Sequence, residues 1–146
     1  MEIREVRESE LTELLELYTE LHDNEMPVMD EKLTTLWKAI LNNPDHHIII
    51  GIEEGKIISS CVIMIIRNLT HHQRPYALIE NVITAEGYRN RGYGTELLRF
   101  AKVIATKEKC YKIMLLTGSK KESTLSFYEK AGYNRNDKTA FIQWIP

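Results

Sequence analysis

The residues with the clearest chemical potential lie in the stretch RNRGYGT, which runs from Arg89 to Thr95. Gly92 and Gly94 let the backbone approach a ligand closely or adopt a positive φ, because glycine has no Cβ. An apolar run at helical spacing follows, and the first N–H groups of a helix lack intrahelical acceptors at its partly positive end. Arg89 and Arg91 add donors and positive charge. The combination predicts a cradle for a phosphate or pyrophosphate group.

Two common phosphate-binding loops do not fit this stretch. No Gly-Lys-Ser or Gly-Lys-Thr follows it, which excludes a Walker loop. A dinucleotide fingerprint would need its third glycine at Leu97, and the next strand ends in LLTGSK without an acidic ribose ligand. The alternative to a ligand site is a plain strand-to-helix turn with solvated arginines.

A second candidate is Glu80, a carboxylate inside the otherwise apolar stretch YALIENVIT. Such a group is costly unless it is paired, hydrated or functional. Strict two-residue alternation predicts that one strand face carries Leu78, Glu80, Val82 and Thr84, and the other Ile79, Asn81 and Ile83. Glu80 is therefore a candidate base, and a structural carboxylate paired with an arginine is the alternative.

Residue patterns also predict the elements that position these groups. Alternating or β-branched runs predict strands at residues 2–6, 46–53, 56–67, 76–84, 111–116 and 139–145, with a small extra strand near Tyr133 as an option. Helical spacing predicts helices after the capping residues Ser9 and Asp30, one after Gly94, and one over residues 122–133 that Gly132 ends. This order predicts one mixed sheet with helices on its faces, where ligands bind at strand ends and helix starts.

The composition indicates a single globular domain over residues 1–146, with 43% apolar and 27% charged residues. No apolar run is long enough to span a membrane, and the acidic start lacks the features of a signal peptide. Cys61 and Cys110 form no Cys-x-x-Cys pair, so we expect a protein of the reducing cytoplasm. A net charge of −2 gives no case for nucleic-acid binding. The histidine pairs 46–47 and 71–72 lack metal-binding spacing, so we expect no metal.

The motifs together resemble one family. RNRGYG matches the Arg/Gln-x-x-Gly-x-Gly/Ala signature of the GNAT superfamily of acyl-CoA-dependent N-acetyltransferases. IENVIT resembles the strand before its pyrophosphate loop, and FYEKAGY resembles its penultimate helix and the following turn, so the resemblance covers essentially the whole chain. It implies a mixed α+β (α/β) domain with a mostly antiparallel central sheet of six to seven strands and about four helices. Lys121 and Thr124 depart from the Asn and small Ala that many members carry there.

The resemblance implies direct acetyl transfer from acetyl-CoA to a primary amine of a small molecule. It makes Tyr128 the general acid for the departing thiolate, with packing on a helix face as the alternative. Glu80 becomes the probable base, directly or through a water, and the N–H of Val82 or Ile83 meets the thioester oxygen. The residues expected to hold acetyl-CoA are Val82, Ile83, Thr84, Arg89, Asn90, Arg91, Gly92, Tyr93, Gly94, Thr95, Ser119 and Tyr128.

Charge segregation bears on the acceptor. Residues 1–31 hold eleven Asp or Glu and two Arg, a net charge of −9, which leaves +7 for the rest of the chain. In the family the loop between the first two helices commonly walls the acceptor side, and here it carries Asp23, Glu25, Asp30 and Glu31. We therefore expect a cationic amine drawn by the local field, and a solvated helix face is the alternative.

Three other functions stay open at this point. They are a non-enzymatic acyl-CoA-binding module, a protein N-terminal or lysine acetyltransferase, and a nucleotide-binding or structural α/β domain. A homodimer is the assembly expected by analogy with such folds.

Overall fold

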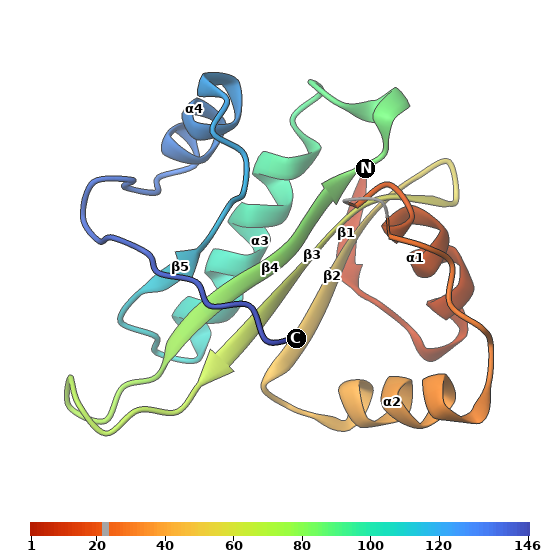
Figure 1. The fold of residues 1–146 in the computed structure, drawn as a ribbon, viewed down its shortest axis with the longest axis horizontal. Coiled ribbons are helices and arrows are strands. Elements are labelled where there is room, and N and C mark those ends of the chain that lie inside the picture. Colours follow the sequence, from red (N-terminus) through yellow and green to blue (C-terminus); the bar gives the residue numbers. More distant parts are fainter. Residues whose placement is uncertain (22–23) are drawn as a thin grey trace. The chain divides into compact units, whose positions relative to one another are not determined.

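The computed structural model describes residues 1–21 and 24–146. They divide into two compact units, Met1–Leu115 and Leu116–Pro146. The first unit holds the sheet and three of the four described α-helices, and the second holds the fourth (Figure 1).

One sheet organises the first unit. Its strands, in chain order and also in spatial order, are β1 (Glu2–Glu5), β2 (His46–Glu53), β3 (Lys56–Ile66), β4 (Tyr76–Thr84) and β5 (Ile113–Leu115). Neighbouring strands from β1 to β4 are antiparallel, and β5 is parallel to β4. The predicted hairpin joins β2 to β3 through Glu54 and Gly55, both at positive φ.

Three α-helices cover the sheet: α1 (Leu11–Tyr18), α2 (Glu31–Asn42) and α3 (Tyr93–Lys107). Asp30 caps α2 as predicted, because its carboxylate accepts the Leu33 N–H at 2.9 Å. The prediction that Ser9 caps the first helix is wrong, because Ser9 lies inside the short 3₁₀ helix η1 (Glu8–Glu10) that precedes α1.

The core has a layer on each face of the sheet. Helices α1 and α2 lie on one face, and α3 lies on the other (Figure 1). The first layer contains Leu14, Leu17, Trp37, Ile48, Ile50, Ile57, Val62 and Ile83. From α3, the sheet buries Leu97, Leu98, Ala101 and Ala105. These apolar stripes at helical spacing hold the helices against the sheet that contains β4.

The second unit contains α4 (Glu122–Lys130). Gly132, which was predicted to end this helix, follows it with a φ of 101°. Residues 131–146 form no strand, so the predicted strands at 139–145 and near Tyr133 are wrong. The described sheet has five strands rather than six to seven. Apolar alternation alone does not make a strand, because its N–H and C=O groups need a neighbouring strand. The large apolar side chains left exposed there are Phe141, Ile142, Trp144 and Ile145.

Candidate functional site

A β-bulge interrupts β4 beside Glu80. Glu80 pairs with Val62 and Ile83 pairs with Ser60, so Asn81 and Val82 together oppose Cys61. Asn81 takes a φ of 53°, in the left-handed region.

The extra residue changes which side chains share a face. Directly paired residues lie on the same face of a sheet, so Glu80 and Ile83 both lie on the face that α1 and α2 cover. Strict alternation placed them on opposite faces. That prediction is wrong because the bulge shifts the pattern by one residue from Val82 onward.

The second half of β4 has an edge that β5 does not pair. Strand β5 pairs with Ala77, Leu78 and Ile79, and its described pairing ends there. The Ala85 N–H donates to the Ile58 carbonyl in β3 at 2.8 Å. Two-residue alternation then turns the Ile83 N–H toward β3 and the Val82 and Thr84 N–H groups toward the unpaired edge. Of the two predicted oxyanion donors, this direction favours Val82.

The predicted cradle forms the link from β4 to α3. A short 3₁₀ helix, η2 (Glu86–Tyr88), leads to Asn90 and Gly92, both at positive φ. Gly92 is the N-cap of α3 with a φ of 87°, and no side chain of the described residues caps the helix. The first N–H groups of α3, from Tyr93 to Thr95, therefore have no intrahelical acceptor.

The space in front of this helix start is open. A Cβ added at Gly92 would meet no described atom within 4 Å beyond its chain neighbours. Glycine is thus needed for the backbone conformation rather than for steric room. Donors, a helix dipole and open space together fit an anionic group such as a pyrophosphate.

The two cradle arginines have different surroundings. The Arg89 Nε donates to the Thr84 carbonyl at 2.9 Å, and its Nη2 lies 3.6 Å from a Glu20 carboxylate oxygen. Glu20 also accepts the Glu86 N–H at 2.9 Å. Arg89 therefore holds the end of β4 to the end of α1. Arg91 is exposed, with its guanidinium 5.3 Å from the Tyr88 ring centroid, and it is the arginine better suited to a ligand.

The side chains of Tyr93 and Glu80 differ in their access to the candidate site. The Tyr93 side chain is buried and its hydroxyl donates to the Glu53 carboxylate, so only its backbone N–H could serve a ligand. Glu80 is exposed, and within the described ranges it forms no ion pair with an arginine. The Glu80 carboxylate is therefore hydrated, which removes the cost of burying it.

Comparison with known proteins identifies the family that has this arrangement. A model of the acetyltransferase (GNAT) family matches residues 9–133. The chain belongs to the GNAT acetyltransferase family.

Individual GNAT relatives agree with the match. A protein of Agrobacterium tumefaciens str. C58, provisionally named an acetyltransferase, has a structure that is 35% identical, covers 99% of this chain and 100% of its own, and superposes with a TM-score of 0.90. Glucosamine-6-phosphate N-acetyltransferase from Arabidopsis thaliana shares the fold, with a TM-score of 0.87 at 24% identity over 99% of this chain and 98% of its own. Glucosamine 6-phosphate N-acetyltransferase of Trypanosoma brucei brucei is 32% identical over 58% of this chain, and the match spans about half of that protein, 55% of its length.

Two predicted site residues belong to the second unit of this GNAT chain. Tyr128 is half-buried in α4, with ring centroids 4.9 Å from Phe127 and 6.3 Å from Tyr133. The Ser119 hydroxyl donates to the Thr124 hydroxyl at 3.1 Å and accepts the Lys121 N–H at 3.3 Å, which stabilises the start of α4.

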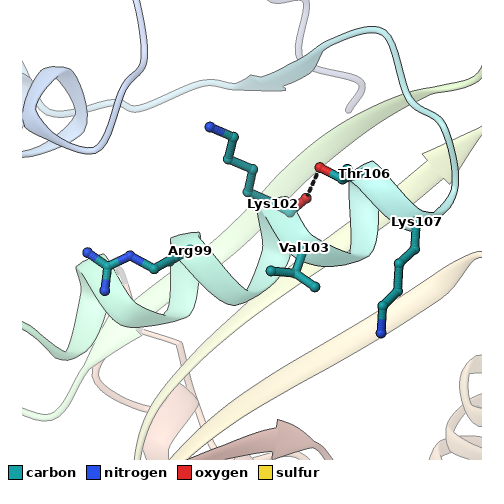
Figure 2. Close-up of a pocket in the computed structure, with 5 residues that line it drawn as sticks. All are labelled: Arg99, Lys102, Val103, Thr106 and Lys107. Carbon is teal, nitrogen blue, oxygen red and sulfur yellow. Dashed lines mark hydrogen bonds between the residues drawn. The ribbon is translucent and has the colours of Figure 1, made fainter.

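A shallow hollow on α3 lies outside the candidate GNAT site. It is lined by Arg99, Lys102, Val103, Thr106 and Lys107, all from the exposed side of one helix (Figure 2). Arg99 pairs with Glu96, and the Thr106 hydroxyl donates to the Lys102 carbonyl at 2.8 Å. We assign no chemistry to this hollow, because its lining contains no carboxylate or histidine base that could activate the Thr106 hydroxyl or a lysine amine.

Metal-binding clusters and membrane-spanning helices are both absent from the described ranges. No cluster of three His, Cys, Asp or Glu side chains in residues 1–21 and 24–146 could hold a metal ion. None of the helices in those ranges is both long and apolar enough to cross a membrane.

The position of Asn81 in the β4 bulge was not predicted from the sequence. The sequence does carry an indication of it, because asparagine is one of the few residues that tolerates the left-handed conformation, and Asn81 interrupts an apolar strand. Reasoning also missed the contact of Arg89 with Glu20, which are separated by most of the first half of the chain and carry no shared motif.

Proposed function

We propose that this GNAT protein transfers an acetyl group from acetyl-CoA directly to a primary amine of a small molecule. One observation carries the proposal: the uncapped start of α3 and the unpaired edge of β4 are joined by a link of eight residues, 85–92. The first suits the pyrophosphate of acetyl-CoA, and the second suits its pantetheine arm and thioester.

The backbone supplies most of the binding. N–H groups of Tyr93, Gly94 and Thr95 donate to the pyrophosphate, and Arg91 adds a charged donor. Asn90 and Gly92 hold the loop open through their positive φ values. Val82 and Thr84 pair with the amides of pantetheine as a neighbouring strand would, next to the buried Ile83.

The reaction then needs three groups. The amine nitrogen attacks the thioester carbon, and the Val82 N–H stabilises the negative charge that develops on the oxygen. Glu80 takes the proton that the amine loses, directly or through a water. As the carbon–sulfur bond breaks, Tyr128 gives its proton to the thiolate. A neutral phenol carries an O–H donor that can supply this proton.

The acceptor side favours a cationic amine. Asp23 lies outside the described residues, and Asp30 is engaged as the cap of α2. Glu25 and Glu31 are exposed, and they carry the acidic wall that remains. Two of the three relatives named above are glucosamine 6-phosphate N-acetyltransferases, whose acceptor is a phosphorylated amine. An acidic wall repels a phosphate, so we expect an unphosphorylated amine here.

Binding of the donor is the first experiment. CoA and acetyl-CoA should raise the Tm, since a ligand at ~100 times its Kd stabilises the folded state by about 2.7 kcal/mol, whereas NAD should not. Failure of CoA to stabilise the protein would overturn the donor assignment.

Turnover is the second experiment. Release of free thiol is followed with putrescine, kanamycin, glucosamine, glucosamine 6-phosphate and a lysine-containing peptide. Turnover with a small amine supports the proposal. Turnover with the peptide alone would establish a protein acetyltransferase, and CoA binding without any turnover would indicate an acyl-CoA-binding module.

A further inference from the structure

A carboxylate lies beside the end of α3 that is expected to bind an anion. Glu53 is the last residue of β2, and its carboxylate accepts a hydrogen bond from the hydroxyl of Tyr93, the first residue of α3. The partly positive start of a helix favours an anionic ligand, and a negative side chain nearby opposes the binding of that ligand. The electrostatics of binding therefore do not explain why a carboxylate lies at this position.

The start of α3 has few other groups to fix its conformation. Its N-cap is Gly92, and no side chain of the described residues caps the helix. Gly94 lies in the same turn, and glycine has more backbone freedom than any other residue. An anion that binds the N–H groups of such a turn must first order them, and this ordering costs affinity.

Tyr93 connects this turn to the sheet. Its side chain is 7% exposed, and the bond from its hydroxyl to a carboxylate is of the strong, charge-assisted kind. Glu53 pairs with Lys56 in the β2–β3 hairpin, so the sheet holds its backbone. The Tyr93 ring also meets the Tyr88 ring edge to face at a centroid separation of 6.2 Å, and the Arg91 guanidinium lies over the Tyr88 ring. One series of contacts thus runs from the hairpin to the arginine better suited to a ligand.

The hydrogen bond between Glu53 and Tyr93 has two explanations. In one, Glu53 only satisfies a buried hydroxyl, which would otherwise cost stability. In the other, it also holds the first N–H groups of α3 in the arrangement that receives a pyrophosphate. The explanations differ in sign. Under the first, loss of a negative charge near an anion leaves binding unchanged or tightens it, and under the second, loss of Glu53 weakens binding.

We propose that Glu53 is a positioning residue for the acetyl donor, which acts through the Tyr93 hydroxyl to hold the first turn of α3 ready for the pyrophosphate. The inference rests on the proposed function and deepens it. Glu53 touches neither the donor nor the acceptor in this proposal, and its effect is confined to the part of acetyl-CoA that the start of α3 binds.

Three variants remove or keep the hydrogen bond. Tyr93→Phe keeps the ring and removes the hydroxyl, and Glu53→Ala removes the acceptor. Glu53→Gln removes the charge and keeps a side-chain oxygen that can accept the bond. Glu54→Ala is the matched control, because Glu54 is the exposed next residue of the hairpin and its loss changes the net charge by the same amount.

The first measurement is the Kd for acetyl-CoA, by calorimetric titration. We expect the Kd to rise roughly 3- to 30-fold in Tyr93→Phe and in Glu53→Ala, because the ligand must then order the turn itself. A Tyr93→Phe/Glu53→Ala protein should show no further rise, because both changes remove the same interaction. Glu53→Gln should lose less affinity than Glu53→Ala, and Glu54→Ala should bind at least as tightly as the wild type.

The second measurement compares two acetyl donors. Acetyl-pantetheine carries the thioester and lacks the pyrophosphate and the nucleotide. The ratio of kcat/KM for acetyl-CoA to kcat/KM for acetyl-pantetheine should fall in Tyr93→Phe and in Glu53→Ala, because only acetyl-CoA uses the start of α3. General damage to the fold would lower both values alike and leave their ratio unchanged.

The outcomes are distinguishable. An unchanged or lower Kd for acetyl-CoA in Tyr93→Phe and Glu53→Ala, together with a lowered Tm, would mean that the hydrogen bond serves stability alone and would overturn the inference. An unchanged ratio for the two donors would overturn it as well. Should Glu53→Ala not fold, Tyr93→Phe carries both measurements. Either result in a wild-type background that binds acetyl-CoA would leave the proposed function standing, and a wild type that does not bind acetyl-CoA would overturn the proposed function with the inference.

Discussion

Replacing Gly92 by alanine tests whether the start of α3 holds the pyrophosphate. Gly92 has a φ of 87°, and an added Cβ meets no other described atom within 4 Å. The variant therefore suffers backbone strain without a steric clash, and the left-handed conformation costs an L-residue about 1–2 kcal/mol. For a chain of this size we expect the Tm to fall by roughly 2–8 °C.

The same strain has a calculable effect on binding. The strain divides between the two measurements. The part that the free variant keeps lowers the Tm, and the part that it relieves by turning the peptide ahead of Tyr93 must be restored when the ligand binds. Relief of the whole ~1–2 kcal/mol corresponds to a roughly 5- to 30-fold rise in the Kd for acetyl-CoA.

The assay is calorimetric titration of acetyl-CoA together with thermal unfolding. Gly55→Ala is the matched control, since Gly55 has a φ of 76° in the β2–β3 turn and an added Cβ there also meets no described atom within 4 Å. Both variants should lose Tm, and only Gly92→Ala should lose affinity. A Gly92→Ala protein that loses less Tm than the control, and so has relieved the strain, but binds acetyl-CoA as the wild type does would refute the cradle assignment.

Four further predictions follow from individual side chains. Tyr128→Phe should lower kcat by roughly 10- to 1,000-fold with little change in the Kd for CoA, and wild-type turnover would return Tyr128 to a packing role. Glu80→Gln should lose most rate at lower pH, where less of the amine is already neutral, and a loss that is uniform across pH would indicate positioning instead. An Asp23→Asn/Glu25→Gln variant should have a lower kcat/KM for putrescine, as should the wild type at high salt. No change in either experiment would mean that the acidic wall has no role in binding the acceptor. Burial raises the pKa of the Cys61 thiol to about 12. The stability that the neutral thiol contributes should therefore be full below the ordinary pKa of 9.0 and should fall as the pH rises toward 12. A Cys61→Ala protein should lack this part of the alkaline transition, and rapid labelling of Cys61 in the folded protein near pH ~8 would contradict its burial.

The parts of the fold that depend on neighbours in the sequence were predictable. Asp30 caps α2 as its type and position indicate, and the hairpin around Gly55 forms where two β-branched runs meet. RNRGYG lies between a strand and a helix, as its glycines and the apolar run after it predict. In each case the physical cause acts within a few residues.

The parts of the fold and of the site that depend on distant contacts were not predictable from the sequence. The final apolar run around Trp144 has the composition of a strand, and whether it pairs is decided by another segment. The motif places Arg89 beside the expected phosphate, and its contact with Glu20, which is far away in the sequence, could not be predicted from the motif. The bulge in β4 was predictable only in part. Asn81 is a residue type that accepts the left-handed conformation, but only the pairing of Asn81 and Val82 opposite Cys61 establishes the bulge.

The two tryptophans make the compact units optically distinguishable. Trp37 is 5% exposed, and its indole N–H donates to the Glu8 carbonyl at 3.0 Å, whereas Trp144 is 83% exposed. Trp37 belongs to the first unit and Trp144 to the second. Emission from Trp37 should therefore be blue-shifted and shielded from iodide, and emission from Trp144 should be red-shifted and readily quenched. A Trp144→Phe protein would report unfolding of the sheet alone, and a Trp37→Phe protein would report the environment of the C-terminal segment, so one fluorimeter can follow each unit through a denaturant titration.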